Sequence, residues 1–157
     1  MSLLALLAVV SPLLGSPQVL PTTVHVQAAE TGQGILRGRG QECFVITPHH
    51  VVKGTLGTVT ITGERGAKGA AEVVRTVPGD LAILRVTERG GLPCAEWTFD
   101  GKVATLLRGT DSGHFELREA SGGSTLVPVT FDTVDADRID VRSSPGASPI
   151  EQGMSGA

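Results

Sequence analysis

Short segments that are rich in β-branched residues or alternate apolar with polar residues follow one another along the first half of this chain. Gly, Pro and charged turn residues separate these segments, which is the pattern of strands joined by tight turns. Six of them precede residue 87, at residues 24–28, 35–37, 43–47, 58–62, 70–77 and 81–86. Six short strands are enough to close a small antiparallel barrel, so we expect an all-β fold.

A second group of strand-like segments follows at residues 102–107, 114–119, 125–134 and 138–142. Gly122 and Gly123 favour a hairpin turn between the second and third of these. Residues 88–101 are the expected connector, and residues 143–153 the expected loop. The sequence therefore predicts two barrels, at residues 22–87 and 102–157, of which the second lacks strands.

The composition fits a packed β-rich domain. A hydrophobic fraction of 40% with 18% charged residues is typical of a globule rather than a disordered chain. The 157 residues include four Phe, one Trp and no Tyr, so aliphatic side chains must fill the core. The net charge is −3 and no dense Lys/Arg patch occurs, which leaves no footprint for nucleic acid.

Residues 1–21 hold an apolar run that spans residues 3–10 and continues at Leu13 and Leu14. A transmembrane helix needs about 20 apolar residues, so we expect no membrane span here. The run has the length of a signal-peptide core, but no Lys or Arg precedes Arg37. Two readings stay open: a signal for a periplasmic or secreted protein, or a segment that packs on the domain of a cytoplasmic one.

The two cysteines, Cys43 and Cys94, also leave two possibilities open. They would form one disulfide in an oxidising compartment, or serve as two buried thiols among apolar side chains. Neither has the spacing of a metal site, and the four histidines form no ligand pattern with them. We therefore expect neither a metal nor a cofactor.

The candidate nucleophile is Ser155, in the run Gly153-Met154-Ser155-Gly156. Glycine on both sides allows a sharp turn that brings main-chain N–H groups beside the hydroxyl. The N–H groups of Gly153 and Ser155 would then form an oxyanion hole. The competing explanation is a flexible terminal tail with no catalytic role.

The candidate base and its orienting carboxylate lie upstream. His49 and His50 follow an apolar strand that ends at Pro48, because proline cannot donate to a strand ladder. Asp80 follows a turn and opens the strand-like segment 81–86. The competing explanations are a solvated pair of loop histidines and an ordinary turn aspartate.

The order of these residues narrows the class of catalyst. In α/β-hydrolases the serine precedes the acid and the base, which excludes them because only two residues follow Ser155. In subtilisins the aspartate precedes the histidine, yet the only acidic residues before His50 are Glu30 and Glu42. The order His, Asp, Ser is that of the chymotrypsin-type double barrel, and it agrees with the β-rich pattern.

On these residues the chain resembles the trypsin-like (chymotrypsin-fold) serine proteases, and in particular the compact bacterial members related to the high-temperature-requirement proteases. The matching stretches are Gly32-Gln33-Gly34 and residues 44–52, 79–84 and 153–157. The resemblance implies a chymotrypsin-like double β-barrel and hydrolysis of peptide bonds through an acyl-enzyme, without cofactor or metal. The substrate would be a protein or peptide.

Carried over residue by residue, the resemblance implies His50 as general base, Asp80 as its orienter and Ser155 as nucleophile. It implies the N–H groups of Gly153 and Ser155 as oxyanion donors. His50 rather than His49 matches the T-x-x-H-V pattern of the family.

Three departures from the family pattern change what we expect. Met154 stands where digestive members carry an aspartate, so activation through a new N-terminus is not expected. Pro149, six residues before the nucleophile, gives no reason to expect cleavage after a basic residue. The strands that follow the serine in the family are missing here.

This third departure leaves two readings of the chain. One is a C-terminally truncated serine endopeptidase from a longer protein. The other is a non-catalytic β-barrel module that binds peptides or partner proteins by strand addition at an open edge. The oligomeric state stays open in both cases.

Overall fold

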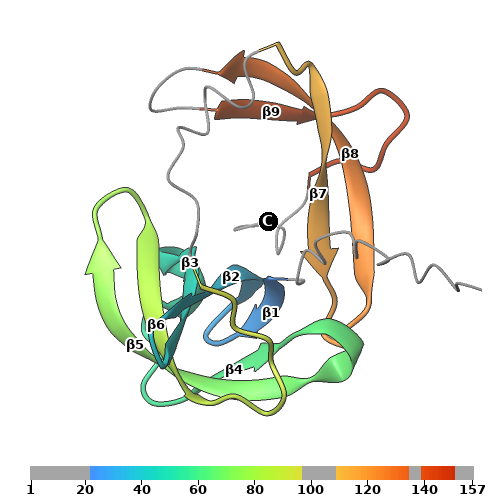
Figure 1. The fold of residues 1–157 in the computed structure, drawn as a ribbon. Helices are drawn as coiled ribbons and strands as arrows, with labels where there is room; N and C mark the ends of the chain where they lie inside the picture. Colours follow the sequence, from blue (N-terminus) through green and yellow to red (C-terminus); the bar gives the residue numbers. More distant parts are fainter. Residues whose placement is uncertain (1–21, 97–108, 135–138, 151–157) are drawn as a thin grey trace, which may run out of the picture.

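The structure is a computed structural model that describes residues 22–96, 109–134 and 139–150. Two β units make up the described chain, a barrel from its first half and a smaller sheet from its second half (Figure 1). The predicted all-β fold with an incomplete second barrel is confirmed. The predicted strand at residues 102–107 and the apolar segment 1–21 lie outside the described residues.

Six antiparallel strands close the barrel in the order β1-β2-β3-β6-β5-β4. They are β1 (Thr23–Gln27), β2 (Thr31–Arg39), β3 (Glu42–Pro48), β4 (Val59–Thr62), β5 (Lys68–Val77) and β6 (Leu81–Glu88). Each contains one of the six predicted segments or overlaps most of it. The largest difference is β2, which begins at Thr31 because Gly32 and Gly34 pair with β1 although glycine is a poor strand signal.

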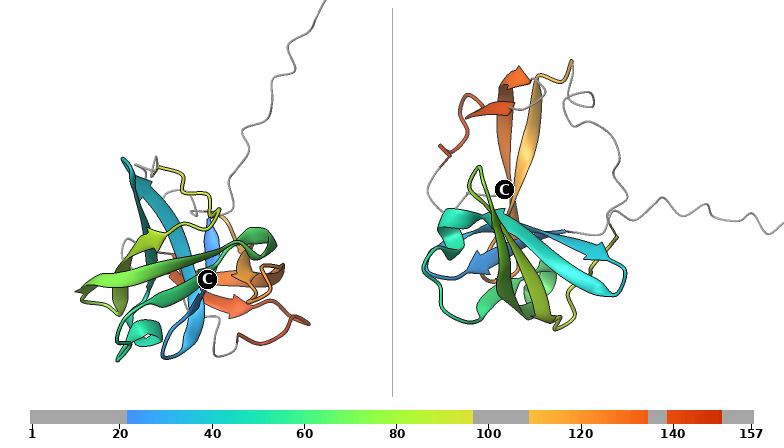
Figure 2. Two further views of the ribbon diagram at one scale, coloured as in Figure 1. Left: turned by 90° about the horizontal axis from the view of Figure 1, so that it is seen from below. Right: turned by 90° about the vertical axis from the view of Figure 1, so that its left-hand side faces the viewer.

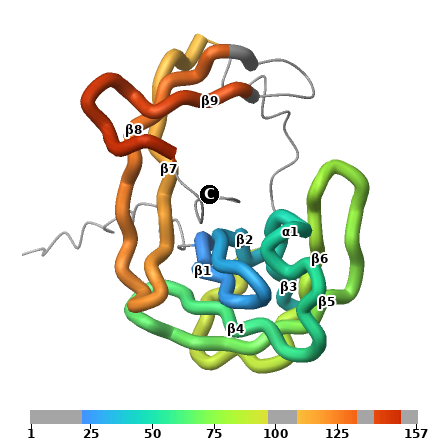
Figure 3. Tube along the Cα trace, turned by 180° about the vertical axis from the view of Figure 1, so that it is seen from behind, coloured from blue at the N-terminus to red at the C-terminus, as the bar shows by residue number. Residues whose placement is uncertain are grey.

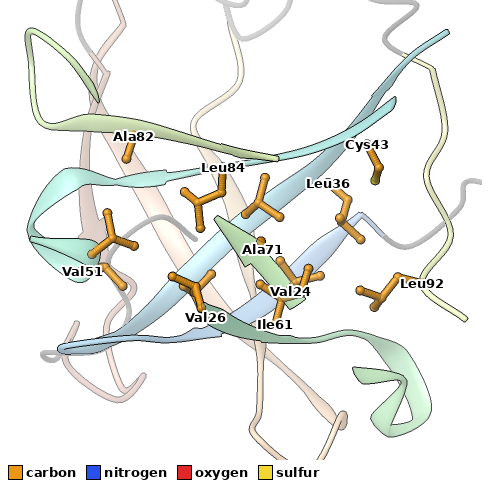
Figure 4. Packing of buried hydrophobic residues seen from close by; sticks show 13 residues of the cluster. Val24, Val26, Leu36, Cys43, Val51, Ile61, Ala71, Ala82, Leu84 and Leu92 are labelled. Atoms are coloured by element: carbon orange, nitrogen blue, oxygen red, sulfur yellow. The ribbon is translucent and has the colours of Figure 1, made fainter. Parts of the chain in front are cut away.

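Aliphatic side chains fill the barrel, as the low aromatic content predicts (Figure 4). Inward residues recur at every second position, for example Val24 and Val26 on β1, both fully buried. Each such side chain contributes roughly 1.5–3 kcal/mol when fully buried. Gly34 makes room for this packing, because a Cβ there would lie 2.6 Å from Cγ1 of Val45.

The second unit is a three-stranded antiparallel sheet with the order β7-β8-β9. Its strands are β7 (Ser112–Arg118), β8 (Ser124–Val134) and β9 (Ile139–Ser143). The predicted turn at Gly122 and Gly123 joins β7 to β8, and the Glu119 N–H donates to the Gly123 carbonyl at 2.9 Å. Val127 and Val129 are its buried hydrophobic residues among those described, so this sheet has little core of its own.

The tip of the β7–β8 hairpin rests on η1 (Glu64–Gly66), a short 3-10 turn between β4 and β5. The Arg65 N–H donates to the Gly122 carbonyl at 3.2 Å. Figure 1 shows this end of the hairpin beside the barrel, and Figure 2 shows the same proximity from two other directions. The sheet is thereby anchored to the barrel at one end of its longest hairpin.

A disulfide joins Cys43 at the start of β3 to Cys94 in the segment after β6. Of the two states that the sequence left open for these cysteines, the structure has the bridged one. The Gly38 N–H also donates to the Ala95 carbonyl at 2.7 Å, so two links hold this segment against β2 and β3. The segment around Cys94 and Ala95 is therefore held against the barrel.

Candidate active site

His50 lies on α1 (His49–Val52), a single helical turn that directly follows β3 and packs against β3, β5 and β6 (Figure 3). The ladder ends at Pro48, which has no N–H to donate. Val51 and Val52 are buried on the barrel side of the turn. The Glu30 N–H donates to the Val51 carbonyl at 3.2 Å and holds the turn from outside. The two histidines thus lie on an anchored helical turn.

Asp80 reaches the same place from the turn before β6. Its backbone has a positive φ of 63°, a left-handed conformation that aspartate tolerates better than most residues. Gly79 precedes it with φ 91°, so two successive left-handed residues reverse the chain. This reversal points both the carbonyl and the carboxylate of Asp80 at α1.

Three hydrogen bonds join Asp80 to the two histidines. Its carbonyl oxygen accepts from the His49 N–H at 2.9 Å. Its Oδ1 accepts from the His50 N–H at 2.9 Å, and its Oδ2 lies 2.6 Å from the Nδ1 of the His50 ring. The ring and the main chain of His50 are therefore both fixed by one carboxylate.

The hydrogen bond from the His50 ring is the main cause that lowers the pKa of Asp80 below its usual value. Burial raises this pKa and is the second-largest effect, while the His50 N–H and the charges of the two histidines lower it further. Asp80 is consequently a carboxylate at neutral pH and offers only acceptors. The proton between the two groups then sits on Nδ1, which leaves the lone pair of a neutral His50 on Nε2.

Both side chains of the His50–Asp80 pair are partly exposed to solvent. The side chain of His50 is 43% exposed and that of Asp80 is 51% exposed. A partner molecule therefore has free access to the imidazole. A free lone pair on a fixed, accessible imidazole is what a general base requires.

The structure separates the roles of the two neighbouring histidines. His49 contributes its backbone N–H to Asp80, while His50 contributes its ring. Ser155 and Gly153 lie outside the described residues, whose last member is Ile150. The structure thus brings together two of the predicted site residues and does not describe the other two.

A groove on the described chain lies elsewhere. It has a volume of about 610 Å³ and opens on the outer face of the barrel. Its lining includes Arg37, Phe44, Ile46 and Arg75 but neither His50 nor Asp80. The imidazole of His50 therefore does not line this groove.

The described residues hold no group of three or more His, Cys, Asp or Glu side chains placed to bind a metal ion. Among these same residues no helix has the length and apolarity needed to cross a membrane.

Sequence reasoning missed the polar residues behind the site. Thr47 and Gln33 are both buried, and the Thr47 hydroxyl donates to the Gln33 carbonyl at 2.8 Å. Gln33 stood out only as the middle residue of a matching motif. Its one available signal was a polar side chain between two glycines, directly before the apolar pair Ile35 and Leu36.

No family model matches the sequence, and no curated protein matches it. Solved structures do resemble the fold. The serine endoprotease from Yersinia pestis superposes with a TM-score of 0.63 at 18% identity, over 87% of this chain and 48% of its own. This chain thus spans about half the length of that protein.

Two further proteases of known structure give similar values. The Rv3671c protease, in its inactive form, has a TM-score of 0.56 at 20% identity, over 87% of this chain and 69% of its own. Deg5 has a TM-score of 0.58 at 19% identity, over 88% of this chain and 73% of its own. The closed barrel, the partial second sheet and these superpositions agree. The chain therefore has the chymotrypsin-like double-barrel fold of the trypsin-like serine proteases, as its sequence motifs predicted.

Proposed function

We propose that this chain is the catalytic part of a serine endopeptidase that cleaves peptide bonds with His50, Asp80 and Ser155. The observation that carries the proposal is the contact of 2.6 Å between Asp80 Oδ2 and His50 Nδ1. It occurs in a fold shared with serine proteases, and the side chain of His50 stays 43% exposed. The additional contact between Asp80 and the His50 N–H holds the backbone of the base as well as its ring.

In the proposed acylation step, the Ser155 oxygen forms a bond to the carbonyl carbon of the substrate while its proton passes to His50 Nε2. Asp80 stabilises the imidazolium that results and does not itself take the proton. The N–H groups of Gly153 and Ser155 would receive the negative charge on the substrate oxygen. The carbon–nitrogen bond then breaks, and the leaving amine takes the proton from Nε2.

In the deacylation step, a water molecule replaces the amine. His50 Nε2 removes a proton from this water, whose oxygen attacks the ester carbon. The bond to the Ser155 oxygen breaks, and the serine regains its proton from the imidazolium. The free acid leaves, and both His50 and Asp80 return to their starting protonation states.

A fluorophosphonate probe tests the proposal on the full-length product of the gene. We expect the probe to label the wild-type protein and the Ser155→Ala variant to lose all labelling. Ser148→Ala is the matched control, because Ser148 lies in the loop after β9 and lacks the glycine frame. Labelling that survives Ser155→Ala would disprove the assignment of the nucleophile.

One observation favours a second candidate function. Within the described chain, β7 and β9 each pair with no strand other than β8, and Gln33 occupies the free edge of β7 only at Arg118. Open edges accept an added strand, so a non-catalytic module would bind extended peptides there. That function predicts no labelling by the probe, together with peptide binding that His50→Ala leaves unchanged.

A further inference from the structure

A glutamine side chain joins the barrel to the second sheet. Gln33 lies on β2 and is 4% exposed. Its Nε2 donates to the carbonyl of Arg118 at 3.1 Å, and its Oε1 accepts from the Arg118 N–H at 2.8 Å. The carboxamide therefore pairs with one residue of β7 as a neighbouring strand would.

This pairing is directional. Both polar groups of the carboxamide and both polar groups of the Arg118 main chain are used at one place. A buried polar group that loses its partner is costly, so only one placement of the two units satisfies all four atoms. An apolar side chain of equal size would fill the space but would leave the Arg118 N–H and carbonyl without these partners.

The side chain of Arg118 strengthens the same junction and is itself buried. Its Nε donates to the Thr23 carbonyl on β1 at 3.3 Å, and its Nη1 donates to the Gly122 carbonyl at 3.1 Å. Its Nη2 bonds the Glu116 carboxylate at 2.7 Å. The buried charge is thus paired, and it ties the hairpin to the first strand of the barrel.

On its other side, Gln33 is tied to the strand that carries the candidate base. The hydroxyl of Thr47, which is buried, donates to the Gln33 carbonyl at 2.8 Å. Thr47 lies near the end of β3, three residues before His50. A continuous series of hydrogen bonds therefore runs from β7 through Gln33 to the strand that ends at α1.

We infer that Gln33 is a positioning residue, which fixes the second sheet relative to the His50–Asp80 pair. The inference rests on the proposed function, in which Ser155 acts with that pair and follows β9 in the sequence. The reacting groups are then supplied by two units that share little core. Catalysis needs them placed to about half an ångström, so play at the junction would misplace the nucleophile without disturbing the base.

The test is Gln33→Met in the full-length product, because methionine keeps the size of the side chain and removes both polar atoms. We expect the rate of fluorophosphonate labelling per folded molecule to fall about 10- to 100-fold, the usual effect of a small misplacement. We expect the pH midpoint of labelling to stay unchanged, since every contact of His50 with Asp80 lies within the barrel. A residue that merely stabilised the fold would lower the melting temperature and leave this rate unchanged well below it.

Two further variants keep the test decisive. Thr125→Val is the matched control, because it removes an exposed hydrogen bond to Glu119 within the same hairpin and should leave the rate unchanged. Gln33→Glu replaces Gln33→Met if the latter does not fold; it keeps the acceptor for the Arg118 N–H and loses the donor. A wild-type rate in the folded variant, or a shifted pH midpoint, would overturn the inference.

A second measurement separates this inference from the proposed function. If the wild-type protein is not labelled at all, the proposed function fails, and residual dipolar couplings then decide on Gln33. We expect amides of the barrel and of the second sheet to share one alignment tensor in the wild type and to need two in Gln33→Met. One shared tensor in the variant would show that Gln33 does not hold the two units together.

Discussion

The Asp80 backbone accepts an unfavourable conformation to make its contacts. A left-handed φ costs a residue with a side chain roughly 1–2 kcal/mol relative to the right-handed region. Three hydrogen bonds to the two histidines offset this cost. Asparagine tolerates the same conformation, so it can replace Asp80 without changing the turn. The substitution Asp80→Asn therefore keeps the turn but removes the charge and one of the two acceptor oxygens that contact His50.

We expect the stability advantage of the wild type over Asp80→Asn to depend on pH. The pKa of Asp80 is lowered in the folded protein from 3.8, so the unfolded chain takes up the proton first as the pH falls. The contribution of the carboxylate is fully present above the unfolded pKa and is lost as the pH falls through the lower folded pKa. Thermal unfolding followed by circular dichroism, at neutral pH and at steps below 3.8, measures this loss.

The control is Asp111→Asn, which removes an exposed carboxylate for which the described residues provide no ion pair. It should give a smaller difference from the wild type at neutral pH. A difference between wild type and Asp80→Asn that persists unchanged to the lowest pH would contradict the assigned cause.

The β7–β8 hairpin depends on glycine at its tip. Gly122 has φ 91°, and a Cβ built there would lie 1.9 Å from the backbone nitrogen of Gly66. The hairpin and η1 therefore meet through two main chains with no side chain between them. Such close approach is open only to glycine.

We expect Gly122→Ala to destabilise the protein by about 1–3 kcal/mol or more, since the new methyl group cannot be accommodated without moving the hairpin. Gly146→Ala is a matched control, because Gly146 also has a positive φ, 81°, but no atom lies within 4 Å of the added carbon. Urea unfolding of both variants separates the steric cost from the backbone cost. Equal destabilisation of the two would mean that the contact with Gly66 carries no weight.

The sequence predicted the positions of most strands and of one hairpin turn, but not the contacts between segments that are distant in the sequence. Alternation located the strands, and the glycine pair located the hairpin turn, because both signals are local. The early start of β2 was missed, since Gly32 and Gly34 are strand residues only through their pairing with β1. The contact of Gly122 with Gly66 was equally beyond reach, because it depends on how two distant segments meet.

For the whole molecule, the strand-like segments predicted two barrels, and the order of His, Asp and Ser agreed with that architecture. Local context and the T-x-x-H-V pattern singled out His50 and Asp80, which the structure places in contact. The assignment of Ser155 and Gly153 stays a prediction. The junction built by Gln33 could not be anticipated, because a lone glutamine in a strand says nothing about which carbonyl it will meet.

The disulfide closes a loop with a sequence separation of 51 residues, which contains β4, β5 and β6 of the barrel. We expect its reduction to lower the free energy of unfolding by about 2–4 kcal/mol. Thermal unfolding with and without a reductant measures the effect. The double variant Cys43→Ala/Cys94→Ala is the control, since its stability should not respond to the reductant. If the melting temperature of the wild type is the same with and without the reductant, the prediction is wrong.

All six strands of the barrel lie between residues 23 and 88, and the barrel ladder is complete without the second sheet. During synthesis the barrel can therefore close while β7 is still inside the ribosome, as N-terminal units generally fold first. Until Arg118 emerges, the carboxamide of Gln33 faces water with no protein partner. The folded barrel of the nascent chain thus presents the Gln33 carboxamide before its partner exists, and the β7–β8 hairpin binds to it once Arg118 has been synthesised and released.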